Sequence, residues 1–525
     1  MNKKSTTYML CAVLIVTVAF LSCSKDTEIE YRDVIVHDTV RISDNSSTTP
    51  EDLPYTVSES GQINTEVSGA IIVNEKDVMI DYADPEKCNI IKRKVSVLKS
   101  VGWRRKWVID CPIMSAFAID PNDKEHVDTT KTVDNVTLIN RGHIEIHTKN
   151  IVECYKEQLV DDDNENREFE YIRMMGLVAS GKNCVLINDG VIDVYFDHDP
   201  SVSCTVYCFT MAGDYGSNII NNGTINFKGN GYSRTRMRGI GVTGSHATAS
   251  NRGTMNMQVE NAEDSRMITA GSDTTNILND GIMIARQPGN TYGMTRYGTN
   301  NIVNNGYISI TETPVPNGQS CVLADGSKFI CGIYENENKN RFSVTPPAIN
   351  RGTIEINIED GCDKVYQGYG MMFHELSPEY DLSISIVNDG VIKTSQSGSV
   401  HHDMAEAGFI TTDNSYTKPG VMYLGHWNTR LRDFSSTHDL FLAKGVEMHF
   451  GGGLISLTKP SDYVDGTKYS VAPEAIMYCV PNSGKYDYIN TYKGYETIEF
   501  DTNEKEIEIS WDTENQTVSL NKISI

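Results

Sequence analysis

A short pattern with Asn-x-Gly at its centre recurs along this 525-residue chain. Each copy has an apolar residue before the asparagine and mostly apolar residues at alternate positions after the glycine. The clear copies are LINRGHIEI (138–146), LINDGVIDV (186–194), IINNGTINF (219–227), ASNRGTMNM (249–257), ILNDGIMIA (277–285), IVNNGYISI (302–310), AINRGTIEI (348–356) and IVNDGVIKT (386–394), and a worn copy, HFGGGLISL (449–457), follows. Such a repeat indicates one structural unit stacked many times.

The alternation after each glycine predicts a strand with one buried face. In the first copy, Ile144 and Ile146 flank Glu145, and a helix would need apolar residues three and four apart instead. Asparagine and glycine tolerate a left-handed backbone, so we expect a left-handed bend between two strands. Stacked copies would bury one continuous core and bring the amides into a hydrogen-bonded ladder. The predicted ladder is Asn140, Asn188, Asn221, Asn251, Asn279, Asn304, Asn350 and Asn388.

The spacing of the copies discriminates among repeat folds. Successive asparagines from Asn140 to Asn388 lie 48, 33, 30, 28, 25, 46 and 38 residues apart. A propeller blade needs about 40–45 residues for its four strands, so the 25-residue step is too short. A parallel β-helix tolerates loops of varied length between fixed strands. We therefore expect an all-β parallel β-helix, and the longest steps can each contain an extra coil without the motif.

This pattern resembles the right-handed parallel β-helix of pectin-lyase-like proteins and autotransporter-type adhesins. The resemblance covers residues 131–457 and implies a solenoid with β caps at both ends. That fold carries enzymes as well as binding surfaces, so the motif is specific for architecture and not for activity. The carboxylate motifs of polygalacturonases (Asn-Thr-Asp, Gly-Asp-Asp and Gly-His-Gly) are missing. Val194–His198 matches a short aromatic-Asp-His motif of pectate lyases, without the arginine motif expected beside it.

The N-terminal residues predict export. Residues 1–22 read as a signal peptide, with Lys3 and Lys4 before an apolar run too short to span a bilayer. Phe20-Leu21-Ser22-Cys23 resembles a bacterial lipobox, and the polar residues after it resemble the export tag of Bacteroidota surface lipoproteins. This resemblance implies lipid attachment at Cys23 and an outer-membrane, surface-exposed location. The predicted domains are then a flexible tether (23–57), an N-terminal β cap (58–130), the β-helix (131–457) and a C-terminal β-rich cap (458–525).

Charge and cysteine content restrict the partners. The formal net charge is -24, which disfavours nucleic acid and also disfavours anionic polysaccharide unless a cation bridges the two. None of the twelve cysteines shows Cys-x-x-Cys spacing, so no zinc or redox motif is present. We expect buried thiols at the cysteines beyond the signal peptide.

Other polar groups suggest chemistry less specifically. The middle residues of the bends, among them Asp189, Asp280 and Asp389, could act as acid and base, but stacked Arg, Asp and Asn also form a neutralising ladder, which we favour. The oxygen-rich segment Asp161–Glu165 could bind calcium, and the alternative is a solvated loop without an ion. His401 and His402 are adjacent and would point to opposite faces of a strand, so we expect no metal site there. No other cofactor is predicted.

The reading that accounts for these features is a membrane-anchored surface lipoprotein. Its β-helix would bind a polysaccharide or a protein of a host or neighbouring cell, and we expect binding rather than catalysis. The alternative is a polysaccharide lyase or glycoside hydrolase on the same scaffold, and no catalytic residue is assigned. Aromatic stretches at Tyr366–Phe373 and Tyr416–Trp427 are expected in long inter-repeat loops, where rings can stack on sugars or pack on the helix.

Overall fold

The fold was analysed in a computed structural model of the chain. It describes residues 39–42, 54–58, 61–80, 91–99, 102–119, 130–155, 169–197, 205–230, 235–271, 274–297, 301–316, 329–336, 348–362, 367–374, 385–398, 403–410, 421–427, 447–450, 453–457, 468–471, 475–479, 496–499, 504–512 and 517–524. The chain divides into two units, residues 1–39 and 40–525, and only Thr39 of the first is described. Cys23 and the signal peptide therefore lie outside the described residues.

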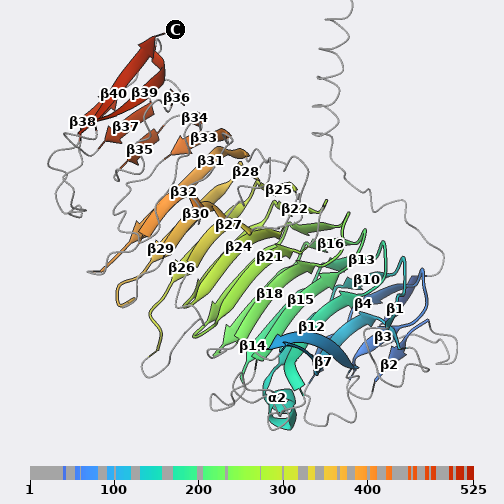
Figure 1. Cartoon of the computed structure of the whole chain (residues 1–525). Coiled ribbons are helices and arrows are strands. Elements are labelled where there is room, and N and C mark those ends of the chain that lie inside the picture. The colour runs from blue at the N-terminus through green and yellow to red at the C-terminus, as the bar shows by residue number, and fades with distance from the viewer. Residues whose placement is uncertain are drawn as a thin grey trace, which may run out of the picture. The chain divides into compact units, whose positions relative to one another are not determined.

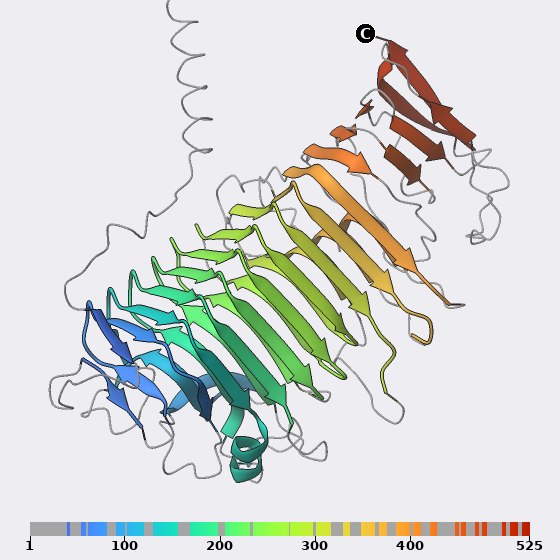
Figure 2. The ribbon, with the colours of Figure 1, turned by 180° about the vertical axis from the view of Figure 1, so that it is seen from behind.

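Within residues 40–525, the described strands between residues 63 and 479 stack, mainly in parallel, as the right-handed parallel β-helix that the repeat predicts. One coil consists of a strand that ends at the repeat asparagine, a second strand after the bend, and a third strand that leads to the next coil. Equivalent strands of successive coils pair in parallel, for example Asn140 with Asn188 and Ile144 with Ile192. Figures 1 and 2 show these strands side by side, coil after coil.

Each of the three strands of a coil belongs to its own sheet. The first sheet contains β4 (Ile71–Asn74), β10 (Thr137–Asn140), β13 (Val185–Asn188), β16 (Asn218–Asn221), β19 (Thr248–Asn251), β22 (Asn276–Asn279), β25 (Asn301–Asn304), β28 (Ala348–Asn350) and the start of β31 (Ser385–Gln396). The second contains β5 (Val78–Ile80), β11 (His143–His147), β14 (Val191–Phe196), β17 (Thr224–Gly229), β20 (Thr254–Val259), β23 (Ile282–Gln287), β26 (Tyr307–Glu312), β29 (Thr353–Ile358) and the end of β31. β31 runs through the bend and so joins these two sheets.

The third sheet comes from segments without a repeat motif. It contains β3 (Ile63–Thr65), β7 (Gly102–Ala116), β12 (Phe169–Ala179), β15 (Thr205–Gly213), β18 (Thr235–Val242), β21 (Asp264–Ala270), β24 (Asn290–Tyr297), β27 (Phe329–Asn336), β30 (Gln367–His374) and β32 (Asp403–Ile410). β30 contains most of the aromatic stretch Tyr366–Phe373, and β33 (Val421–Trp427) contains the end of Tyr416–Trp427. The expectation of loops was wrong for these described parts, because β30 in the third sheet and β33, which continues the stack beside β31, both lack the repeat motif.

The core is a set of inward-facing columns between the three sheets. One such column on the second sheet consists of the fully buried Ile144, Ile192, Ile225 and Met255. The residues that alternate with them along each strand face outward. Phe196 and Phe227 stack at 6.4 Å between ring centroids within the same core. The alternation therefore arises because one face of each strand packs inward while the other meets solvent.

The repeat asparagines from Asn140 to Asn350 point inward at the corner and are fully buried, while the side chain of Asn388 lies outside the described part of the structure. Each side-chain amide donates to the side-chain oxygen of the next asparagine, over 2.9 Å from Asn140 to Asn188 and 2.7 Å from Asn304 to Asn350. The bonds between them are equally continuous, and the series begins one coil earlier at Asn74. Asn74 was missed in the sequence because Lys76 stands where the other copies have glycine.

The glycine of the repeat is needed for a reason other than the one expected. Among the described residues, the repeat glycines are not in the left-handed region. Instead, a Cβ added at Gly223 would lie 2.0 Å from the carbonyl oxygen of Gly190 in the coil before. Close stacking of backbones, and not a left-handed bend, excludes every side chain at this position.

Left-handed residues occur at the corner between the third and first sheets. Asn135, Asn183, His246 and Thr274 have φ values of 60°, 55°, 60° and 57°, and Gly69 and Gly216 occupy the same place in their coils. The Asn183 amide donates to the Tyr215 carbonyl of the next coil at 2.9 Å, so this corner also stacks. A β-branched residue such as Thr274 is strained there.

Elements outside the regular coils lie between strands and toward both ends of the stack. They are β1 (Thr39–Ile42), β2 (Thr56–Val57), β6 (Ile91–Lys99), β8 (Ala118–Ile119), β9 (Thr130–Lys131), α2 (Lys149–Tyr155), β34 (Glu447–Phe450), β35 (Gly453–Leu457), β36 (Lys468–Val471), β37 (Ala475–Cys479), β38 (Glu496–Glu499), β39 (Glu504–Asp512) and β40 (Thr517–Ser524). Antiparallel pairs β6–β7 and β39–β40 occur near the two ends. No helix of the described part is long and apolar enough to cross a membrane.

The long steps between copies are mainly insertions. β10 pairs directly with β13, and β25 directly with β28, so the 48- and 46-residue steps contain no extra coil. In the interval after Asn388, β33 pairs with β31 on one side and β34 on the other, which adds a coil without the motif. Parallel pairing continues to β36 and β37, into the segment predicted as the C-terminal cap.

We predict that Asn279→Leu lowers the stability of the β-helix by about 3 kcal/mol or more, because two buried hydrogen bonds are lost and their partners stay unsatisfied. Asn279 accepts from Asn251 at 2.9 Å and donates to Asn304 at 2.7 Å. The urea midpoint of the full chain measures the effect. Asp280→Ala, at the exposed neighbour, should change it by less than about 0.5 kcal/mol, and equal midpoints for both variants would contradict the ladder.

Candidate functional site

The middle residues of the bends form a column of exposed polar side chains. Arg141 lies 3.7 Å from Asp189, whose other oxygen accepts from Asn222 at 2.9 Å. Two coils further, Asn305 donates to Asp280 at 2.7 Å. Asp189 and Asp280 thus face a cation or an amide along the stack, which is the arrangement of a neutralising ladder, and the side chain of Asp389 lies outside the described part. The described part of this column does not resemble an acid and base held for catalysis.

The other residues singled out in the sequence are scattered. Val194 faces the core, while Tyr195 and Asp197 project from the outer face of β14. Asp161–Glu165, His198, His401 and His402 lie outside the described residues. The described cysteines, Cys111, Cys184, Cys208, Cys331 and Cys362, are buried and unbridged, which confirms the expectation of buried thiols for these five.

A row of arginines and tyrosines follows the outer face of the third sheet, where the sequence offered no motif. The register brings Arg173 beside Tyr207, Tyr207 beside Arg236, and Arg236 beside Asp264. A second row lies two residues further along the strands. There Arg238 is beside Arg266, and Arg266 is beside Tyr292. We call this set the arginine–tyrosine strip, and it comprises Arg173, Tyr207, Arg236, Arg238, Asp264, Arg266 and Tyr292.

Each guanidinium in the strip is held by neighbours. Arg236 donates through Nε and Nη2 to Glu263 Oε1, at 3.0 and 2.6 Å, and through Nη1 to the Tyr207 hydroxyl. Its guanidinium lies 5.2 Å from the centroid of the Tyr207 ring, within cation–π distance. Arg173 bonds both oxygens of Asp110. These contacts fix the planar donors and raise the pKa of Arg236 despite the opposing effect of its burial.

Asp264 joins two arginines that would otherwise repel each other. Arg238 and Arg266 face each other in register. Arg238 donates through Nη2 to Asp264 at 2.5 Å, and Arg266 donates through Nε to the same carboxylate at 3.2 Å. Burial raises the pKa of Asp264, but the charges and hydrogen bonds of both arginines outweigh it and hold the pKa below the ordinary 3.8. Asp264 is therefore a carboxylate at neutral pH.

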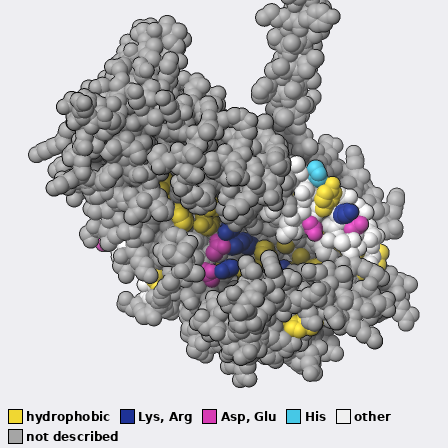
Figure 3. Space-filling model, viewed as in Figure 1, with side chains coloured by type: hydrophobic (Ala, Val, Ile, Leu, Met, Phe, Trp, Pro, Cys, Tyr) yellow, Lys and Arg dark blue, Asp and Glu magenta, His cyan; other side chains and the backbone are white. Residues whose placement is uncertain are grey.

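The charged residues of the strip balance to a small positive charge. Figure 3 shows cationic, acidic and hydrophobic side chains side by side in the part of the view where Figure 1 labels β18 and β21. Among the described side chains, four guanidiniums meet three carboxylates, those of Asp110, Glu263 and Asp264, so the local balance is positive by one charge. Burial raises the pKa of Tyr207 and Tyr292, which keeps both phenols neutral. The strip therefore combines rigid hydrogen-bond donors with aromatic rings on one sheet face.

Sequence reasoning missed the strip because its members are far apart in the chain and follow no short motif. Tyr207, Arg236, Arg266 and Tyr292 belong to four successive coils whose connecting segments differ in length. The only available signal was an arginine-rich segment, Arg234–Arg238, within a chain of formal net charge -24.

We predict that Asp264→Asn lowers the unfolding free energy by about 3 kcal/mol at pH 7, because a neutral amide leaves two stacked guanidiniums uncompensated. The folded-state pKa of Asp264 lies below its ordinary 3.8, so its contribution is present above that value and is lost as pH falls through the folded pKa. Urea midpoints at pH 7, 5 and 3 test this. Glu359→Gln, in an exposed ion pair with Arg286, serves as the control. If the stability difference between wild type and Asp264→Asn did not decrease toward low pH, Asp264 would not be the ionised carboxylate that holds the two arginines.

Comparison with known proteins identifies one relationship. The model of a family described as the BigA third pectate lyase-like domain matches residues 118–243 and 199–415, which together span more than half of the chain. The two matches overlap, as expected where similar coils follow one another. No curated protein and no solved structure matches the chain.

Proposed function

The chain belongs to the family of the BigA third pectate lyase-like domain, and we propose that it is a binding module that holds an acidic polysaccharide along the arginine–tyrosine strip. The observation that carries the proposal is the repeated pairing of a guanidinium with a tyrosine ring on one sheet face. Arg236 lies over Tyr207 at 5.2 Å and Arg266 over Tyr292 at 5.3 Å.

The geometry favours a linear chain of sugars over a compact ligand. The paired residues lie on four successive strands, β15, β18, β21 and β24, so the two tyrosines are three strand spacings, about 14 Å, apart with the arginines between them. Planar guanidiniums bind carboxylates through two parallel hydrogen bonds, and tyrosine rings pack against pyranose faces. The positive balance of the strip favours uronate groups, although the chain as a whole is acidic.

A polysaccharide lyase or glycoside hydrolase is the second candidate. The proximity of Asp264 and Glu263 to three arginines on one sheet face favours it, because such enzymes combine carboxylates with a basic residue. Both carboxylates, however, are bonded to guanidiniums, and the pKa of Asp264 is lowered rather than raised. A general acid needs the opposite shift. Binding is therefore the better-supported function.

We further propose that the module is displayed on the outer membrane as a lipoprotein. The support is the sequence Phe20-Leu21-Ser22-Cys23 after a short apolar run, with a polar segment following it. A lipid on Cys23 together with residues 24–57 as a tether would hold the β-helix away from the membrane.

We predict that Arg236→Gln weakens binding of polygalacturonate by about tenfold, the effect of losing one charge-assisted hydrogen-bond pair. Calorimetry on the full chain measures the affinity. The methyl ester of the same polymer lacks the charge. Its binding to the wild type should be at least as weak as the binding of polygalacturonate to Arg236→Gln. In parallel, new reducing ends and unsaturated ends report any cleavage.

Arg286→Gln is the control, because Arg286 is likewise an arginine paired with one glutamate, Glu359, but lies on the second sheet and is more exposed than Arg236. It should bind like the wild type. Equal losses in both variants, or equal binding of the esterified polymer, would contradict the proposed site. Formation of cleavage products would show that the protein is an enzyme and not a binding module.

We predict that Cys23→Ala releases the protein from the membrane, because the residue that would carry the lipid is lost. Fractionation of cells expressing the variant measures this. Ser22→Ala keeps a small residue before the cysteine and should remain membrane-bound. A Cys23→Ala protein that stayed in the membrane fraction would refute the lipid anchor.

A further inference from the structure

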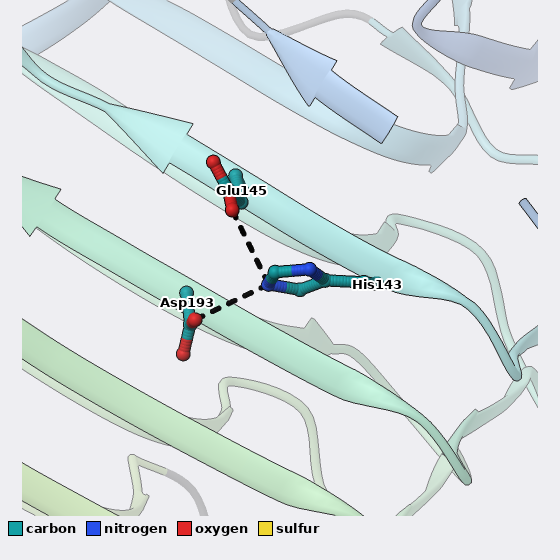
Figure 4. Close-up of side chains that lie close together, drawn as sticks. All are labelled: His143, Glu145 and Asp193. Atoms are coloured by element: carbon teal, nitrogen blue, oxygen red, sulfur yellow. Dashed lines mark hydrogen bonds and ion pairs between the residues drawn. The ribbon is translucent and has the colours of Figure 1, made fainter. Parts of the chain in front are cut away.

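Three possible metal ligands from two neighbouring strands meet on the outer face of the second sheet. His143 and Glu145 are two residues apart on β11 and share one face, and Asp193 stands opposite Glu145 on β14. His143 Nε2 lies 3.2 Å from Asp193 Oδ2 and 3.7 Å from Glu145 Oε1, and the three ligand atoms lie within 4.8 Å of one another. Figure 4 shows His143 pointing between the two carboxylates.

We propose that His143, Glu145 and Asp193 bind a divalent transition-metal ion such as Zn²⁺. Ligand atoms about 2.1 Å from a tetrahedral ion lie roughly 3.4 Å from each other, and two of the three separations are already 3.2 and 3.7 Å. One imidazole nitrogen with two carboxylate oxygens suits zinc better than calcium, which prefers oxygen alone. The fourth position faces solvent.

Neighbouring groups orient the ligands as outer-shell partners do in metal sites. Asn226 donates to Asp193 Oδ1 at 2.6 Å, which turns Oδ2 toward His143. His147 contacts the second oxygen of Glu145 at 3.4 Å and is itself held by Asp197 at 2.8 Å. The Asp193 side chain is only 9% exposed, so its carboxylate cannot turn freely into solvent.

The placement of like charges gives an independent reason to expect a cation at this site. Among the strand pairs that the structure describes, like charges face each other in register at two places, Arg238 with Arg266 and Glu145 with Asp193. The arginines share Asp264 as a counterion. At the carboxylates, the nearest full positive charge is Lys228, 3.5 Å from Asp193 on a side chain that is 46% exposed. A dication would neutralise both carboxylates, and Lys228 would turn outward.

Titration calorimetry of the metal-depleted full chain with Zn²⁺ tests the site. We expect one ion per chain, with His143→Ala weakening binding by at least about tenfold. Lys228→Met should strengthen binding, because it removes the charge that competes for Asp193. Ca²⁺ should bind at least about tenfold more weakly than Zn²⁺.

Two further measurements make the result specific. His246→Gln, at an exposed histidine of the opposite corner, should leave Zn²⁺ affinity unchanged, and metal-free melting temperatures show whether each variant folds. Wild-type affinity in His143→Ala, weaker binding in Lys228→Met, or equal affinity for Ca²⁺ would overturn the proposal. Polygalacturonate binding at the arginine–tyrosine strip is measured separately, so either conclusion can fail alone.

Discussion

The close approach of successive coils at the Asn-x-Gly corner determines the rest of the structure. The backbones stack so tightly that a Cβ at Gly253 would lie 2.0 Å from the Gly223 carbonyl oxygen. At the same corner, the side-chain amides of most ladder asparagines donate both to the next asparagine and to the carbonyl two residues on in their own coil, as Asn221 does to Asn251 and Gly223. A slip by one residue would break every one of these buried bonds and turn the core face outward. Register is therefore fixed wherever the corner is present.

Fixed register converts residues far apart in sequence into neighbours about 4.8 Å apart. Asp193 lies opposite Glu145 and Arg266 opposite Arg238 for this reason alone, although 48 and 28 residues separate them in the chain. Loops of any length can connect the strands without changing these columns. The outer faces can therefore carry a site while the inward columns and the corner maintain the fold.

The sequence predicted what the corner controls and little of what it does not. The strand alternation and the positions of the asparagines follow from short-range pattern, because burial and the corner impose them on every copy. Asn74 escaped because Lys76 replaces glycine, and the third sheet escaped because nothing repeats along β12, β15 and β18. The arginine–tyrosine strip depends on register between those strands, which no single segment contains. The role of glycine was misassigned because close stacking involves a neighbouring coil.

Charge along a column distinguishes scaffold from site. Two like charges about 4.8 Å apart repel by roughly 3 kcal/mol at an effective dielectric constant of 20, so a stack under structural constraint alone should alternate. The corner column does so, with Asp189 between Arg141 and Asn222. Arg238 with Arg266, and Glu145 with Asp193, break that rule on two different sheets. A local conflict of this kind marks a functional position more reliably than a motif, because a stack that only had to fold would lose nothing by removing it.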